Sequence, residues 1–204
     1  MEIKEKMKSG MLYCNTDPGL EEEQIRSMDQ IFMSNRLLPS QWAEREAILK
    51  ELFASLGEGC FIVPPFFAPW GKNIHFGKGI FANTNLRLLD DTDIYVGDDV
   101  MFAPNVTITT AAHPIDPTLR KKKMEYNLPV HIGANAWLGT GVIVLPGVTI
   151  GENAVIGAGS VVTKNIPGNV VAVGNPCRVL REITDHDREY YFQDRKIDPA
   201  LFED

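Results

Sequence analysis

The chain has 204 residues, of which 44% are apolar and 23% are charged, and its formal net charge is -7 at pH 7. This length is sufficient to bury a core in one domain with a small appendage. The acidic balance argues against a general nucleic-acid binder, which requires a basic face, but it is compatible with a local basic patch for a phosphorylated ligand.

The first ten residues are charged and contain no apolar stretch, so we expect no secretory signal. No apolar run is long enough to span a membrane. The cysteines, Cys14, Cys60 and Cys177, are odd in number and widely spaced, which is typical of free thiols in a reducing compartment. We therefore expect a cytoplasmic protein.

Residues 1–60 are predicted to form a helical segment. One helix begins at Pro18, where the acidic residues that follow suit a helix N-terminus. A second helix is expected to have Ser40 as its N-cap and to stop at Gly57. Its apolar stripe consists of Trp42, Leu49, Leu52, Phe53 and Leu56.

We expect one domain over residues 61–180 and a C-terminal extension over residues 181–204. From Phe76 onward, the domain follows a six-residue repeat. The first position of nearly every six is bulky and apolar, and it is occupied by Phe76, Ala82, Leu88, Val96, Phe102, Ile108, Ile132, Leu138, Val144, Ile150, Ile156 and Val162. Glycine is frequent at the second position, where it relieves crowding as the backbone turns. Three such sides close a triangular coil, and stacked coils bury equivalent residues inside. A β-sandwich is the alternative, but it would not keep a strict six-residue phase, so we predict a mainly β fold, a parallel β-helix.

Residues 114–131 interrupt the repeat. They number eighteen, the length of three sixes, so we expect a loop that leaves and re-enters the stack at one corner. Loops inserted on a rigid scaffold commonly carry function. His113 precedes this loop, and a histidine there is either a loop anchor or a general base, because its pKa lies near the operating pH.

The sequence resembles a known family over nearly its whole length. The hexapeptide series, the segments PWGKNIHFG, FANTNL and TAAHPIDP, and the tail REITDHDREYYFQDRKID are similar to the galactoside and maltose O-acetyltransferases, and the tail favours the galactoside branch. The resemblance implies a left-handed parallel β-helix, acetyl-CoA as co-substrate, and a homotrimer with active sites between subunits. It also implies that His113 of one chain faces Trp137 of its neighbour.

The resemblance further implies roles for individual residues. His113 matches the general base, an amide near Thr140 matches an oxyanion donor, and Asn83 matches a position that contacts the acceptor sugar and assists the oxyanion. Glu125 is either the carboxylate that orients His113 or a solvated loop charge. In the absence of a nucleophile motif, we expect direct attack in a ternary complex.

Acceptor and coenzyme contacts are also implied. For the acceptor they are Asn15, Asp17, Asn83, Asp91 and Trp137. For the coenzyme they are Trp137, Gly139, Thr140, Ala158, Thr163, Lys164, Arg178 and Arg181. The sequence departs from the galactoside pattern at Asn15, which takes the place of an acidic sugar contact, and at Pro69, which takes the place of a small hydroxyl residue. These departures concern the acceptor, which is a galactoside, maltose, glucose or a non-sugar hydroxyl compound.

Two other classes of protein remain as alternatives. His75, His113 and His131 share the last position of their sixes, which would align them on one corner as in a zinc enzyme of the γ-carbonic-anhydrase type, but the HxxxxH spacing of that family is absent. We therefore expect no metal. A non-catalytic β-helix scaffold is the other alternative.

Overall fold

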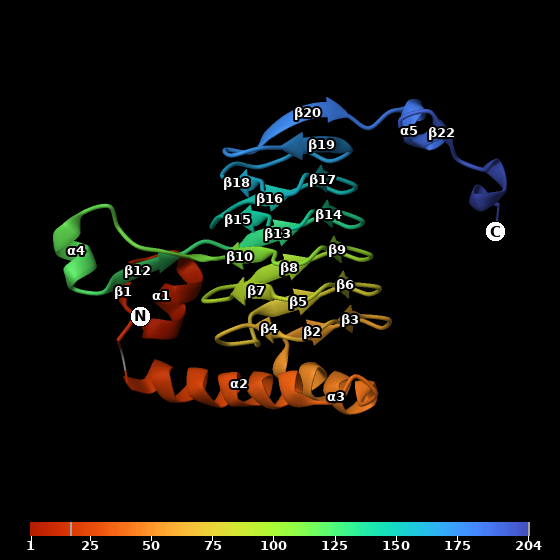
Figure 1. The fold of residues 1–204 in the computed structure, drawn as a ribbon. Helices are drawn as coiled ribbons and strands as arrows, with labels where there is room; N and C mark the ends of the chain where they lie inside the picture. The colour runs from red at the N-terminus through yellow and green to blue at the C-terminus, as the bar shows by residue number, and fades with distance from the viewer. Residues whose placement is uncertain (17, 204) are drawn as a thin grey trace.

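The computed structural model describes residues 1–16 and 18–203, which form an upright β-solenoid with helices beneath it (Figure 1). The N-terminal part contains α1 (Ile3–Ser9), β1 (Tyr13–Cys14), α2 (Pro18–Arg36) and α3 (Trp42–Leu52). The last two helices pack against each other under the first coil. None of the helices in the described part of the chain is long and apolar enough to cross a membrane.

The second predicted helix is shorter at both ends than its sequence pattern indicated. Its N-cap is Gln41 rather than Ser40, because Ser40 lies in a turn that is closed by the bond from the Gln41 amide to the Leu38 carbonyl. The helix ends at Leu52 rather than at Gly57. The N-cap prediction and the predicted end were therefore wrong.

The residues after this helix belong to the solenoid. Phe53 is extended, and its ring lies 5.7 Å from the ring of Phe66 and 5.3 Å from that of Phe76, edge to face in both cases. Leu56 lies in the first strand of the stack and pairs with Phe76. Core packing and ladder hydrogen bonds thus replace the last helical turn that the apolar stripe predicted.

The solenoid has three faces of stacked parallel strands (Figure 1). Face 1 contains β2 (Ser55–Leu56), β5 (Ile74–Phe76), β8 (Ile94–Val96), β13 (Val130–Ile132) and β16 (Thr149–Ile150). Face 2 contains β3 (Phe61–Ile62), β6 (Phe81–Ala82), β9 (Met101–Phe102), β14 (Trp137–Leu138), β17 (Val155–Ile156), β19 (Val170–Val173) and β20 (Arg178–Glu182). Face 3 contains β4 (Phe66–Phe67), β7 (Leu86–Leu89), β10 (Thr107–Thr109), β15 (Ile143–Val144) and β18 (Val161–Val162). The predicted β-helix is confirmed.

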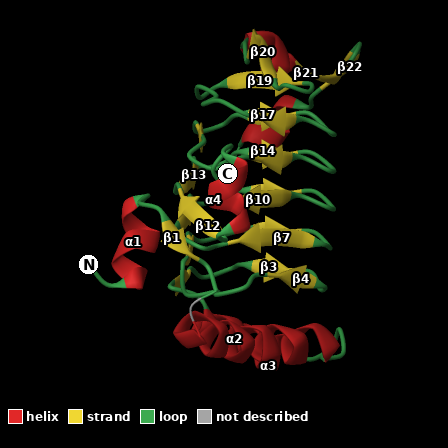
Figure 2. Cartoon of the chain, turned by 90° about the vertical axis from the view of Figure 1, so that its left-hand side faces the viewer, coloured by secondary structure: helices red, strands yellow, loops and turns green. Residues whose placement is uncertain are grey.

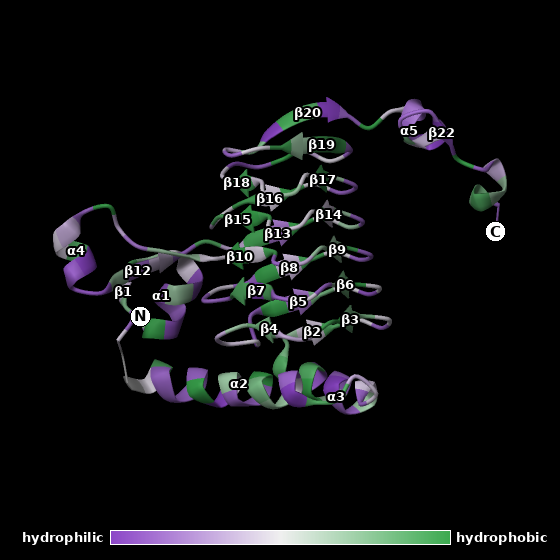
Figure 3. Ribbon diagram, in the orientation of Figure 1, coloured by the Kyte–Doolittle hydropathy of each residue, from purple (hydrophilic) through white to green (hydrophobic). Residues whose placement is uncertain are grey.

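The core is built from the repeat as its period indicates. All the residues predicted at the first position of the sixes are buried in one hydrophobic cluster, and Figure 3 shows hydrophobic colour concentrated on the strands of the solenoid. The glycines at the second position permit close stacking. A Cβ on Gly133, for example, would lie 2.4 Å from the backbone nitrogen of Glu152 in the next coil. The repeat therefore determines both the apolar interior and the spacing of the coils.

The inserted loop spans residues 110–129, because β10 ends at Thr109 and β13 begins at Val130. It leaves from face 3 and returns to face 1, which is the single corner that we predicted. Both ends lie earlier than in the predicted loop 114–131, since His131 already pairs with Tyr95 in face 1. We call residues 110–129 the insert. It contains β11 (Ala111–Ala112), α4 (Pro117–Lys121) and β12 (Met124–Asn127).

The insert is held by the N-terminal segment. β12 pairs in antiparallel fashion with β11 on one side and with β1 on the other, so three short strands form a separate sheet beside the solenoid (Figure 2). The two segments that meet in this sheet are about a hundred residues apart in sequence. The sheet therefore fixes the position of the insert, and with it the position of His113.

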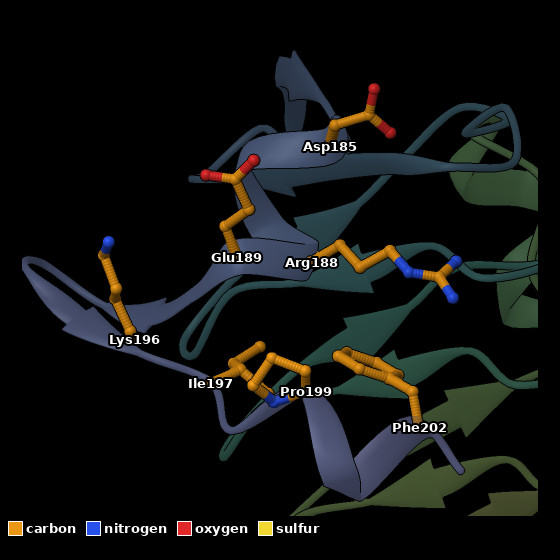
Figure 4. Close-up of a pocket in the computed structure, with 7 residues that line it drawn as sticks. All are labelled: Asp185, Arg188, Glu189, Lys196, Ile197, Pro199 and Phe202. Carbon is orange, nitrogen blue, oxygen red and sulfur yellow. The ribbon is translucent and has the colours of Figure 1, made fainter.

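The C-terminal end closes the stack. β20 runs antiparallel to β19 and ends the parallel ladder. Residues 183–203, the C-terminal extension, then form α5 (Asp185–Glu189), β21 (Tyr190–Phe192), β22 (Arg195–Lys196) and the 3₁₀ helix η1 (Pro199–Phe202). The extension surrounds an open hollow of about 500 Å³, where the guanidinium of Arg188 lies 4.9 Å from the centre of the Phe202 ring (Figure 4).

Candidate active site

In three successive coils, a connecting segment at the corner between face 3 and face 1 extends out from the solenoid. Residues 68–73, residues 90–93 and the insert all depart from the solenoid at this corner. β1 adds a fourth segment from the N-terminal part. This corner brings polar side chains from distant parts of the chain together beside His113.

His113 is held by a hydrogen bond to one ring nitrogen, and its other ring nitrogen is accessible to a substrate hydroxyl. Its Nδ1 lies 2.8 Å from the backbone oxygen of Met124. Because a carbonyl oxygen only accepts hydrogen bonds, Nδ1 carries the proton and Nε2 of the neutral ring is unprotonated. The His113 side chain is 49% exposed. This is the tautomer that a general base acting through Nε2 requires.

Glu125 faces the open nitrogen of His113 but does not orient the ring. Its Oε2 lies 3.8 Å from Nε2 of His113, which is longer than a hydrogen bond. The carboxylate is buried, accepts a hydrogen bond from the Tyr13 hydroxyl at Oε1, and accepts one from Nδ2 of Asn15 at Oε2 over 2.9 Å. The hydrogen bond that holds the ring therefore comes from the backbone of Met124, and Glu125 is buried rather than solvated.

Two adjacent aspartates lie beneath this cluster. Trp70 donates from its ring nitrogen to Asp91 over 3.1 Å and from its backbone to Asp90 over 3.0 Å. Burial, opposed by the hydrogen bond from Trp70 and aided by the charge of Glu125, raises the pKa of Asp91 to about 6. Burial likewise raises the pKa of Asp90 to about 8. Near neutral pH, Asp91 is therefore mainly ionised, whereas Asp90 is mainly protonated.

The acceptor residues expected near the N-terminus are described only in part. Asn15 is exposed, and its amide binds Glu125, so the structure brings Asn15 to the His113 corner. Asp17 lies outside the described residues. Tyr13, Trp70 and Asn127 also belong to this corner, although the sequence patterns did not point to them. No short-range signal links Tyr13 to Glu125, because 112 residues separate them.

The other predicted contacts lie on a different side of the solenoid. Trp137 projects from face 2 and is 48% exposed. It lines an open hollow of about 710 Å³ between face 2 and the C-terminal extension, together with Met101, Val155 and Phe202. Since the corner between faces 3 and 1 is opposite face 2 in a three-sided coil, one chain keeps Trp137 apart from His113.

The corner between face 2 and face 3 carries a third group. Asn83 follows β6, and its side-chain oxygen accepts a hydrogen bond from the backbone of Thr84 over 2.8 Å. Gly139 and Ala158 occupy equivalent corners of successive coils, where a Cβ on Gly139 would lie 2.7 Å from the Ala158 nitrogen. Thr140 is exposed, and its carbonyl accepts a bond from the Gly159 amide in the next coil over 2.8 Å. These residues form a column at this corner, and the hydrogen bonds described for them stay within the solenoid.

The predicted basic residues lie in the last coils of the stack, Lys164 directly after face 3 and Arg178 and Arg181 in β20 of face 2. Thr163 and Lys164 are exposed directly after β18. The backbone of Cys177 bonds to the carbonyl of Val161, which brings Arg178 toward the same end. Arg181 makes two hydrogen bonds of 2.7 and 2.6 Å to Asp187, and these bonds hold the pKa of that carboxyl well below its usual range. Arg181 is thus paired within the chain, whereas Lys164 faces solvent.

Comparison with known proteins relates this chain to acetyltransferases, both through family models and through individual relatives. Residues 129–164 match the bacterial transferase hexapeptide model, and residues 6–57 match the maltose acetyltransferase hexapeptide capping motif. The galactoside O-acetyltransferase of Escherichia coli (strain K12) is 45% identical over 201 residues, which cover 98% of this chain and 99% of that protein. The galactoside O-acetyltransferase of Lactococcus lactis (strain IL1403) is 54% identical over 188 residues, covering 92% of this chain and 91% of that protein. The chain belongs to the galactoside and maltose O-acetyltransferase family.

Solved structures of the O-acetyltransferase family superpose closely on this chain. A galactoside acetyltransferase in complex with coenzyme A gives a TM-score of 0.94 at 45% identity and covers 97% of this chain and 99% of its own. A maltose O-acetyltransferase from Clostridium difficile 630 gives 0.89 at 49% identity and covers 90% of this chain and 98% of its own. Both confirm the hexapeptide solenoid with its N-terminal helices.

In this O-acetyltransferase, the three histidines do not form the column that the alternative zinc site requires. His75 and His131 stack on opposite faces of the Tyr95 ring on face 1, with centroid distances of 4.5 and 4.8 Å. His113 lies in the insert instead, because the insert begins before it rather than after it. No group of three or more His, Cys, Asp or Glu side chains in the described part of the chain could hold a metal ion. The expected shared column was therefore wrong.

Proposed function

We propose that this chain transfers the acetyl group of acetyl-CoA to a sugar hydroxyl by direct attack in a ternary complex, with Nε2 of His113 as the general base. The observation that carries this proposal is the 2.8 Å contact between Nδ1 of His113 and the Met124 carbonyl. It leaves an unprotonated, accessible Nε2 on a ring whose orientation is fixed by backbone. A base in that state removes the hydroxyl proton as the oxygen attacks the thioester carbon.

The proton and electron balance needs no further reactant. The sugar oxygen forms a bond to the acetyl carbon while its proton moves to Nε2, and a tetrahedral oxyanion results. When this intermediate collapses, the carbon–sulfur bond breaks, and the thiolate of coenzyme A takes the proton back from the imidazolium. A backbone amide near Thr140 and the side chain of Asn83 are proposed to donate to the oxyanion.

The acceptor is proposed to bind beside His113, where Asp91 and Asn15 offer polar groups. Asp91 is a suitable acceptor for sugar hydroxyls because it is partly buried and its remaining acceptor capacity is not screened by bulk water. Trp137 is proposed as a wall of the groove, since its amphipathic ring suits both a sugar and the pantetheine arm. Asp17 belongs to the same proposal on the basis of resemblance alone.

The coenzyme is proposed to lie along the column of Gly139, Thr140 and Ala158, with its phosphates near the basic end of the stack. Lys164 and Arg178 are exposed there, and Thr163 adjoins them. Arg181 would exchange its bonds to Asp187 for a phosphate, which can also accept two parallel hydrogen bonds from a guanidinium. The family relative that was solved with coenzyme A supports this class of ligand.

A homotrimer is proposed because the two halves of the site lie on different sides of one chain. The base is in the insert, whereas Trp137 and the coenzyme column are on face 2 and on the corner between faces 2 and 3. Neighbouring solenoids placed side by side would bring the insert of one chain to the column of the next. The physical basis is the geometry of a three-sided prism with closed rotational symmetry.

The test is thiol release from acetyl-CoA over a panel of galactosides, maltose, glucose and non-sugar alcohols. We expect sugar-dependent release that falls by a factor of roughly 10² to 10⁴ in His113→Ala. His131→Ala is the matched control, because the His131 ring lies on face 1 and stacks on Tyr95 instead of reaching the His113 corner, and it should retain activity. Release that requires an alcohol other than a sugar would change the acceptor class, and release indifferent to His113 would overturn the mechanism.

A further inference from the structure

The N-terminal strand β1 is paired with the two residues that contact His113. Cys14 is in register with Met124, whose carbonyl binds Nδ1, and Tyr13 is in register with Glu125, whose carboxylate faces Nε2. The backbone of Asn15 extends this pairing with a bond to the Lys123 carbonyl over 3.1 Å. A short segment that lies outside the solenoid therefore supports the base from below.

The Tyr13 side chain extends this support to the carboxylate. Tyr13 is only 3% exposed, and a buried phenol hydroxyl requires a polar partner. It donates to Oε1 of Glu125, and the side-chain amide of Asn127 lies 3.1 Å from the same hydroxyl. Because Asn15 binds the other oxygen, the carboxylate of Glu125 is held at both ends.

We propose that Tyr13 is a positioning residue for acetyl transfer, which holds Glu125 so that Oε2 faces the atom of His113 where the imidazolium forms. This role rests on the proposed function of His113 as the base. Tyr13 does not touch the reacting atoms, and it acts through the carboxylate that it binds.

The chemical consequence concerns the charged intermediate. When Nε2 takes the proton of the acceptor hydroxyl, the ring becomes a cation whose new N–H lies beside Oε2 of Glu125. A fixed carboxylate at this position stabilises the cation without having to reorganise, whereas a mobile one spends part of its time elsewhere. The attraction between the imidazolium and Glu125 ends when the departing thiolate takes the proton and the ring becomes neutral.

The charged and titratable groups that face His113 come from several elements. Glu125 faces it from β12, and Asp91, which follows β7, interacts with it electrostatically. Arg120 of α4 donates to the carbonyls of Pro114 and Ile115 next to it. Tyr13 reaches it only through Glu125. A change at Tyr13 is therefore expected to act on His113 through one carboxylate, and the other groups stay in place.

The experiment measures the pH profile of kcat/KM for Tyr13→Phe, which removes only the hydroxyl. We expect kcat to fall about tenfold, as is typical for the loss of a hydrogen bond to a charged group, with KM for acetyl-CoA unchanged. We also expect the acid limb of the profile to shift to lower pH, because an imidazolium without a fixed carboxylate loses its proton more readily. Tyr126→Phe is the matched control, since Tyr126 alternates to the other side of the same strand.

A double mutant separates positioning from general stability. Glu125→Gln should shift the acid limb in the same direction, and adding Tyr13→Phe should change it no further, because both act through one carboxylate. Additive effects, or a Tyr13→Phe profile that superimposes on that of the wild type, would overturn the role of Tyr13. If Tyr13→Phe did not fold, Asn15→Ala would test the held carboxylate from an exposed position. A wild type without His113-dependent transfer would overturn the proposed function, and the role of Tyr13 with it.

Discussion

His113 and Trp137 belong to opposite sides of the same solenoid. His113 lies in the insert at the corner between faces 3 and 1, and Trp137 projects from face 2. The hydrophobic core occupies the space between them. Residues on opposite sides of a rigid, close-packed prism cannot contact one ligand together within a single chain. A site that uses both residues must therefore be built from two chains.

The first prediction concerns mixed assemblies. His113→Ala and Asn83→Ala should each lose most activity alone, but co-expression of the two should restore a measurable part of it. The reason is that, in the proposed trimer, some interfaces between the two variants combine an intact insert with an intact column. The measurement is sugar-dependent thiol release by the purified mixture, with sedimentation of each variant to establish its oligomeric state. A mixture no more active than the single variants would place both residues in one subunit's site.

The second prediction concerns the pH dependence of stability. Asp90 is fully buried, and its pKa is raised from 3.8 to about 8, so folding favours its neutral form. This contribution is fully present below the unfolded pKa and is lost as the pH rises through about 4 to 8. Asp90→Asn should therefore flatten the fall in Tm between pH 5 and pH 8.

Thermal unfolding of the two proteins over this pH range checks the second prediction. Asp98→Asn is a suitable control, because Asp98 is an exposed carboxylate whose Oδ2 lies 3.8 Å from Nζ of the exposed Lys78. Parallel Tm curves for Asp90→Asn and the wild type would show that Asp90 does not titrate in this range.

The third prediction concerns the coenzyme. Arg181 is bound by Asp187, so the proposed coenzyme phosphate would have to displace that carboxylate. We expect Asp187→Ala to lower KM for acetyl-CoA and Arg181→Ala to raise it, whereas neither change alters the acceptor preference. Steady-state kinetics at two salt concentrations measures this, since contacts with phosphates weaken as ionic strength rises. Arg188→Ala, in the same extension, provides the control. An increase of KM in Asp187→Ala would indicate that the ion pair itself shapes the site.

Much of the fold was predictable because it is periodic. The six-residue phase from Phe76 to Val162 depends only on local spacing, and each apolar first position is buried as expected. The same periodicity placed the insert at one corner. The errors occur where tertiary packing competes with a local pattern: Leu56 pairs with Phe76 instead of completing a helix, and His131 joins face 1.

The arrangement at His113 required the tertiary structure. The sequence by itself determined the coil, its interior and the chemistry available in the insert, because these follow from repeats and from residue types. It left open whether Glu125 is the carboxylate that orients His113 or a solvated loop charge, and it did not point to Tyr13. The antiparallel pairing of β1 with β12 decided both, since it joins segments 112 residues apart and places Met124 and Glu125 on either side of one imidazole. Such long-range pairing depends on loop closure and packing, which no local pattern encodes.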